Sequence, residues 1–224
     1  MVNAKRQVIA CATVIEEMLP FLPNDVPYEI LDFGLHIQPA ELKMALQAKI
    51  DQASQNVDVI LLGYGLCSMA IVGLKATTAT LVIPRVADCI ALFLGSDAAY
   101  KQQTQKEPGT YYLTKGWIEA GDGPFEEHKK LIAKFGEDKA HRLTQLILKN
   151  YKRLGFINTG QVDIERYRTY ARDTADKFGL HYEEIKGSPA LVKKMINGPW
   201  DEEFLVISPG QTIHYLDFVN SDPK

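Results

Sequence analysis

The stretch Val57-Asp-Val-Ile-Leu-Leu-Gly-Tyr-Gly-Leu-Cys67 contains an apolar run, a glycine-rich turn and a cysteine in direct succession. A short, nearly continuous apolar run that ends in turn residues is typical of a strand buried in a parallel sheet. Residues 7–10 and 80–83 have the same character, and Cys11 and Cys89 follow them. The sequence therefore predicts three buried strands, each with a cysteine just past its carboxyl end.

Strand-like and helix-like segments alternate through the rest of the first half. Pro39 predicts a helix start, because proline suits the first turn and an acidic residue favours the positive end of the helix dipole. This helix runs to about Ala53, with apolar residues mostly on one face: Leu42, Ala45, Leu46, Ala48 and Ile50. The other predicted segments are a helix around Glu16–Met18, a strand over 28–33, a helix from Ser68 and a helix over 88–93. The β-α-β order indicates an α/β fold, a Rossmann-like parallel sheet flanked by helices.

The second half repeats this order. The predicted segments are strands over 109–114, 153–158, 181–185 and 204–207 and helices over 124–135, 137–151, 163–178 and 189–196. Gly116-Trp-Ile-Glu119 is interpreted as a continuation of the strand over 109–114. We expect a first lobe over 1–105, which carries the three cysteines, and a second α/β lobe over 106–224. One continuous doubly wound sheet is the alternative.

Composition and charge exclude several classes of protein. The chain has 224 residues, 46% hydrophobic and 24% charged, which suits a globular protein with a real core. A formal net charge of -3 provides no broad basic surface for nucleic acid. The apolar stretch between Val57 and Leu74 is interrupted by glycines and Asp58, so no membrane span is expected. No signal peptide is recognisable, and a cytoplasmic protein without structural disulfides is expected.

Because the carboxyl ends of parallel strands share one edge of a sheet, Cys11, Cys67 and Cys89 are expected to meet there. Thiolates are soft ligands for zinc, copper(I) and iron–sulfur clusters, and the long gaps between the cysteines disfavour a small zinc knuckle. The arrangement resembles that of quinolinate synthase and of three-cysteine desulfidases and dehydratases. In those enzymes three thiolates hold a [4Fe-4S] cluster with one open iron. A nucleophilic thiolate and inert core thiols are the alternatives.

Residues beside the cysteines are candidates for chemistry. Arg85 is expected to orient an anionic group, and Asp88 to position it or act as a base. An internal Arg85–Asp88 ion pair is the alternative. Glu17 is a candidate general acid or base near Cys11, with a solvated helical glutamate as the alternative. These three residues, Arg85, Asp88 and Glu17, are the predicted catalytic residues.

The predicted substrate-binding residues come from the same turns. Gly63 and Gly65 are expected to permit close approach of the backbone and positive φ, and Tyr64 offers a hydroxyl group. A plain tight turn is the alternative. Thr13 and Arg85 complete this set, and Tyr111, Tyr112 and Trp117 are further candidate pocket walls. No two of the five histidines have metal-ligand spacing, so the sequence indicates no histidine chemistry.

Several segments together resemble the domain-of-unknown-function 1638 family. They are Ala10-Cys-Ala-Thr13 with Glu17-Met18, Leu61-Leu-Gly-Tyr-Gly-Leu-Cys67, Ile83-Pro-Arg-Val-Ala-Asp-Cys-Ile90 with Leu94-Gly-Ser96, and Gly109-Thr-Tyr-Tyr-Leu-Thr-Lys-Gly-Trp117. Where such proteins commonly read Pro-Arg-x-His-Asp-Cys, this chain has Ala87, which leaves no histidine ligand or proton carrier there. The resemblance implies an accessory protein found beside corrinoid-dependent methyltransferases in anaerobic bacteria and archaea.

The expected function is that of an iron–sulfur protein whose open iron binds and activates a small anionic substrate. Lyase, desulfurase and methyl-transfer-related chemistry are all compatible with this expectation. The alternative is a non-catalytic accessory protein that handles a metal or a corrinoid, with zinc as the alternative metal. In that case a corrinoid protein or a methyltransferase is the expected partner.

Overall fold

The computed structural model describes residues 4–120 and 124–219, and the chain forms two compact units. The first unit combines Met1–Ala98 with Ser188–Lys224, and the second is the continuous segment Ala99–Gly187. The predicted boundary near residue 105 lies close to the start of the second unit. The chain beyond residue 187 differs from the expected second lobe, because its last strand pairs with the sheet of the first unit.

The first unit is built on a five-stranded sheet with the order β2-β1-β3-β4-β8. The strands are β1 (Arg6–Cys11), β2 (Tyr28–Leu31), β3 (Val59–Gly63), β4 (Thr80–Pro84) and β8 (Phe204–Ile207). The first four are parallel, and β8 lies antiparallel to β4 at the edge. Every residue of β3 is buried, as its continuous apolar run predicts.

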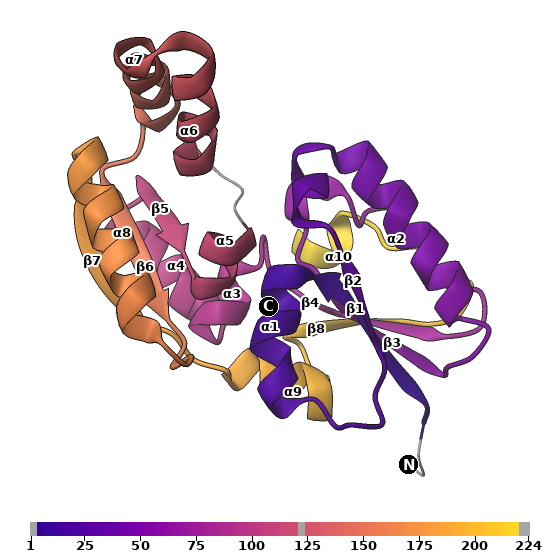
Figure 1. The fold of residues 1–224 in the computed structure, drawn as a ribbon. Helices are drawn as coiled ribbons and strands as arrows, with labels where there is room; N and C mark the ends of the chain where they lie inside the picture. The colour runs from indigo at the N-terminus through magenta and orange to yellow at the C-terminus, as the bar shows by residue number, and fades with distance from the viewer. Residues whose placement is uncertain (1–3, 121–123, 220–224) are drawn as a thin grey trace. The chain divides into compact units, whose positions relative to one another are not determined.

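The chain leaves β1 toward β2 on one side and later returns to β3 on the other side. Helix α1 (Ala12–Met18) makes the first connection and α2 (Pro39–Ala53) makes the second. Right-handed crossovers in opposite directions place these helices on opposite faces of the sheet, as Figure 1 shows. The remaining helical segments of this unit are η1 (Leu19–Phe21), η2 (Phe33–Ile37), η3 (Cys67–Met69), α3 (Ile90–Leu94), α9 (Ala190–Asn197) and α10 (Leu216–Val219). The point where the strand order reverses lies between β1 and β3.

The second unit has a separate parallel sheet with the order β5-β6-β7. The strands are β5 (Thr110–Leu113), β6 (Arg153–Asn158) and β7 (His181–Lys186). The helices are α4 (Asp97–Lys106), which begins at the unit boundary, α5 (Lys115–Ala120), α6 (Pro124–Phe135), α7 (Glu137–Leu148) and α8 (Ile164–Phe178). Its core includes Phe125 of α6, Leu154 and Phe156 of β6, and Tyr167 of α8.

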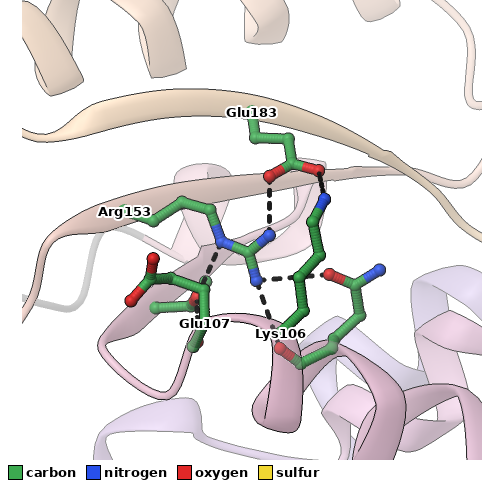
Figure 2. A network of polar contacts seen from close by, with 6 residues as sticks. Lys106, Glu107, Arg153 and Glu183 are labelled. Carbon is green, nitrogen blue, oxygen red and sulfur yellow. Dashed lines mark hydrogen bonds and ion pairs between the residues drawn. The ribbon is translucent and has the colours of Figure 1, made fainter.

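A buried arginine ties the elements of the second unit together (Figure 2). Arg153, at the start of β6, is 2% exposed. Its guanidinium donates to Thr110 Oγ1 at 2.7 Å and to Glu183 Oε2 at 2.6 Å, and it also reaches the side chain of Gln103. Lys106 donates to the other oxygen of Glu183 at 2.6 Å. The network therefore connects α4, β5, β6 and β7.

The predicted α/β class with a mainly parallel, helix-flanked sheet is confirmed. The predicted strand over residues 116–119 is wrong, because the segment belongs to helix α5. Thr114 ends the extended chain there: its hydroxyl accepts the backbone N–H of Trp117 at 3.2 Å, and its carbonyl accepts that of Ile118. Helix α4 was not predicted, and the expected helix from Ser68 is only the short turn η3. In α2, Ala48 is exposed, and Ala53 completes the buried face in its place.

No helix within the described ranges combines the length and the apolar character that crossing a bilayer requires.

Candidate functional site

The first unit places the predicted site at the reversal point of its sheet. Cys11 is the last residue of β1 and lies opposite Leu31 of β2. Ala10 lies opposite Gly63, the last residue of β3. In doubly wound sheets the crevice outside the strand ends at such a point is the usual ligand site. Cys11 and the turn after β3 border this position.

The turns after β3 and β4 run side by side. The backbone N–H of Leu66 donates to the carbonyl of Val86 at 3.0 Å, and that of Cys67 donates to the carbonyl of Ala87 at 3.2 Å. A Cβ atom added to Gly65 would lie 2.7 Å from the carbonyl oxygen of Val86. The absence of a side chain at Gly65 therefore lets the segment that carries Cys67 approach the segment that leads to Cys89.

The structure brings the three thiols into one electrostatic neighbourhood. Cys11, Cys67 and Cys89 are 1%, 9% and 6% exposed. Burial raises the pKa of each thiol above its ordinary value, and Cys11 raises the pKa of the other two further. Mutual effects of this kind require groups that lie near one another in a medium of low dielectric constant. All three cysteines are free thiols.

Two predicted partners of Cys11 lie on α1. The Thr13 hydroxyl is 3.1 Å from the Cys11 sulfur, and both residues are buried. Glu17 is only 8% exposed, so the alternative of a solvated glutamate is wrong. A buried carboxyl group on the helix that follows Cys11 is a candidate for the predicted role as a general acid or base.

The glycines of the turn act differently from the expectation. Neither Gly63 nor Gly65 has positive φ, so that part of the prediction is wrong. A Cβ on Gly63 would lie 2.6 Å from the Cβ of Ala10, so this glycine permits close packing of β3 on β1. The left-handed residues are Cys67 (φ 43°) and Met69 (φ 70°), which are not glycines. Strained backbone of this kind is concentrated at functional sites, where the surrounding structure holds it in place.

Arg85 and Asp88 follow β4. The Arg85 side chain borders a surface cavity of about 330 Å³ lined also by β8 and by Leu216 and Asp217. Its Nε atom is buried and has no hydrogen-bond partner among the described residues. Asp88 accepts the backbone N–H of Ile90 at 2.9 Å. Its charge contributes to the raised pKa of Cys67 and Cys89, which places it near the thiols.

Tyr64 is fully buried beside the thiols, and its hydroxyl has no hydrogen-bond partner among the described residues. Burial raises the pKa of this hydroxyl above its ordinary value, and the three cysteines raise it further. Its ring stacks on that of His36, with centroids 5.9 Å apart and an interplanar angle of 24°. The sequence indicated no role for His36, which lies in η2 after the end of β2.

The other predicted candidates lie in the second unit. Tyr111 and Trp117 pack against its core, and Tyr112 is on the same strand as Tyr111. His128 is buried and within 2.9 Å of the Thr144 hydroxyl.

Thiols are the type of ligand that a soft metal or a cluster takes. In the parts of the chain that the structure describes, no three His, Cys, Asp or Glu side chains converge on a common point as bound metal requires.

Comparison with known proteins gives a family but no activity. A family model described as "Protein of unknown function (DUF1638)" matches residues 30–196. No curated protein and no solved structure matches the chain.

Proposed function

The chain belongs to the DUF1638 family, and we propose that Cys11, Cys67 and Cys89 hold a [4Fe-4S] cluster whose open iron binds and activates a small anionic substrate. The observation that carries the proposal is that three buried thiols lie at or just past the carboxyl ends of three neighbouring parallel strands, β1, β3 and β4. One isolated buried cysteine is ordinary core packing, whereas three from separate strand ends in one place are not.

The surrounding residues support this site in distinct ways. The Thr13 hydroxyl, 3.1 Å from the Cys11 sulfur, stabilises a thiolate by donating to it. Gly65 holds the two cysteine-bearing turns together. Asp88 and Glu17 are the candidates for moving a proton, and Arg85 Nε, at the cavity lined by β8, is an unused donor for an anionic group. When bound, the cluster supplies a Lewis-acidic iron.

Zinc bound by the same thiols is the second candidate. Three thiolates suit zinc, which takes cysteine sulfur in tetrahedral sites, and they leave its fourth position for another ligand. In that case the chain acts as an accessory protein that handles a metal or a corrinoid, with a corrinoid protein or a methyltransferase as its partner.

Metal analysis of protein produced without oxygen tests the proposal. We expect about four irons per chain and broad absorption near ~400 nm from sulfur-to-iron charge transfer. Each of Cys11→Ser, Cys67→Ser and Cys89→Ser should abolish both signals. Ala140→Ser is the matched control, since it adds a hydroxyl at a fully buried position of the second unit and should leave both signals intact.

Other outcomes decide between the candidates. Stoichiometric zinc without iron that is lost in the same three variants supports the accessory function. Protein that contains no metal, and that remains equally stable when all three cysteines are serine, contradicts both proposals.

A further inference from the structure

Two neighbouring rings in the first unit each carry a buried polar atom without a hydrogen-bond partner among the described residues. They are Tyr64 Oη and His36 Nε2. Buried polar atoms in native proteins are nearly always paired, so an unpaired one requires an explanation such as a water or a ligand. The two rings are stacked with centroids 5.9 Å apart, so one polar group in contact with both atoms is the simplest partner for the two.

The protonation of His36 follows from its other ring nitrogen. Nδ1 lies 2.9 Å from the carbonyl oxygen of Phe33, and a carbonyl only accepts. Nδ1 therefore carries a proton, and in the neutral tautomer with this proton Nε2 presents a lone pair. His36 Nε2 is an acceptor without a donor.

The Tyr64 hydroxyl, in contrast to His36 Nε2, has a proton to donate. The Tyr64 side chain is fully buried, and burial favours the neutral phenol. The Tyr64 hydroxyl is therefore a donor without an acceptor.

The two side chains come from strands on either side of β1. His36 lies in η2, which follows β2, and Tyr64 directly follows β3, while β1 lies between these strands and ends at Cys11. The stacked rings thus meet across the carboxyl end of β1, beside the thiols whose charges affect Tyr64.

We propose that Tyr64 Oη and His36 Nε2 together recognise the hydroxyl group of a small hydroxy acid. A hydroxyl oxygen accepts from Tyr64, and its proton is donated to His36, so this group takes the place of a water molecule and satisfies both atoms at once. A carboxylate oxygen satisfies Tyr64 only. The acid part of the ligand rests on the proposed function, in which the substrate is a small anion, whereas the donor–acceptor pair exists with or without a metal.

Calorimetric titration of the full-length protein with matched acids tests this inference. The pairs are malate against succinate, lactate against propionate and glycolate against acetate, with both enantiomers of malate and lactate. We expect at least one hydroxy acid to bind tighter than its deoxy partner by about tenfold or more, because a site that pairs a hydroxyl group rejects the analogue without it.

Variants of the two side chains locate the discrimination. Tyr64→Phe and His36→Leu should each reduce the preference to within about threefold. Tyr182→Phe removes a hydroxyl from the second unit and should leave the preference unchanged. Equal binding of every acid and its deoxy partner, binding of none of them, or a preference that survives in both variants would overturn the inference.

Two further measurements separate this inference from the proposed function. In protein with all three cysteines changed to serine, a persistent preference for a hydroxy acid supports the pair even if no metal is found. A protein that holds a cluster but binds each acid and its analogue equally disproves only the recognition of a hydroxyl group by Tyr64 and His36.

Tyr64→Phe should also leave the midpoint of thermal unfolding unchanged or raise it. A clear fall would show that the hydroxyl has a structural partner, and it would contradict the inference.

Discussion

The thiols of Cys11, Cys67 and Cys89 are held in their protonated form by their surroundings. Burial is the main cause of the raised pKa in all three, and the neighbouring thiols and Asp88 add to it for Cys67 and Cys89. Because the thiolate is the reactive form, the three cysteines of the metal-free protein should be weak nucleophiles at neutral pH. Any ligand that binds them must compensate for the removal of their protons.

We expect iodoacetamide to label the native, metal-free protein very slowly at neutral pH and to label all three cysteines rapidly in denaturant. The labelling rate of the native protein should also remain low when the pH is raised to 9.0, the ordinary pKa of a thiol, because the pKa of each thiol in the folded protein lies above that value. Mass spectrometry of the digested protein identifies the modified residue. Rapid native labelling of any of the three would contradict the described burial.

Gly65 is the residue whose size matters most at the site. Gly65→Ala should reduce the free energy of unfolding by about 2 kcal/mol or more, because its Cβ would lie 2.7 Å from a backbone oxygen. Gly160→Ala is the control: its φ of 81° is left-handed, but nothing lies within 4 Å of the added atom, so a cost of about 1 kcal/mol is expected. Urea denaturation measures both. An equal cost at the two positions would show that the turns have room to separate.

At the scale of elements, the second unit depends on a polar network at one end of its sheet. Hydrogen bonds from Lys106 and Arg153 lower the pKa of Glu183, which lies on β7. A carboxyl group with a lowered folded pKa stabilises the protein above its unfolded pKa. This stabilisation is lost as the pH falls through the folded value. The network should therefore weaken in acid below the ordinary range of glutamate.

Glu183→Gln should reduce the free energy of unfolding at neutral pH by about 2 kcal/mol, because it leaves the buried Arg153 guanidinium without a charged partner. Glu165→Gln also removes a carboxylate that pairs with an arginine, Arg168, but Glu165 is 80% exposed, so about 0.5 kcal/mol or less is expected. Urea denaturation at neutral and acidic pH tests both variants. The difference between wild type and Glu183→Gln should shrink in acid, and a difference that grows would contradict the assigned pKa direction.

At the scale of the whole molecule, the chain leaves the first unit and later returns to it. The second unit has its own sheet and core within one continuous segment. The first unit needs both ends of the chain, because β8 pairs with β4. The second unit can therefore fold from one continuous segment, whereas the first unit requires segments from both ends of the chain.

A fragment of residues 99–187 should unfold cooperatively on its own, as followed by circular dichroism during heating. A fragment of residues 106–224 is the control. It lacks most of α4 and carries β8 without β4, so we expect it to be less stable and to aggregate through the unpaired strand. A non-cooperative transition in the first fragment, or equal behaviour of the two, would contradict this division of the chain.

Local patterns predicted most elements of this fold. Continuous apolar runs mark β1, β3 and β4, and Pro39 marks the start of α2, because each pattern depends only on nearby residues. The segment 116–119 was mistaken for a strand because its aromatic and β-branched residues suit one, whereas the Thr114 hydroxyl caps a helix. At the site, strand ends predicted the positions of the cysteines and Tyr64. His36 was missed because its relation to them is spatial.

The sequence by itself determined the α/β class, the buried strands β1, β3 and β4 and the glycine-rich turn that carries Tyr64, because periodicity and turn chemistry act over a few residues. Only the tertiary structure decided that β8 returns to β4, that the Cys67 and Cys89 turns run side by side and that His36 stacks on Tyr64. These contacts join residues far apart in the chain. Their free energy comes from pairing and burial across the whole unit, which no local pattern records.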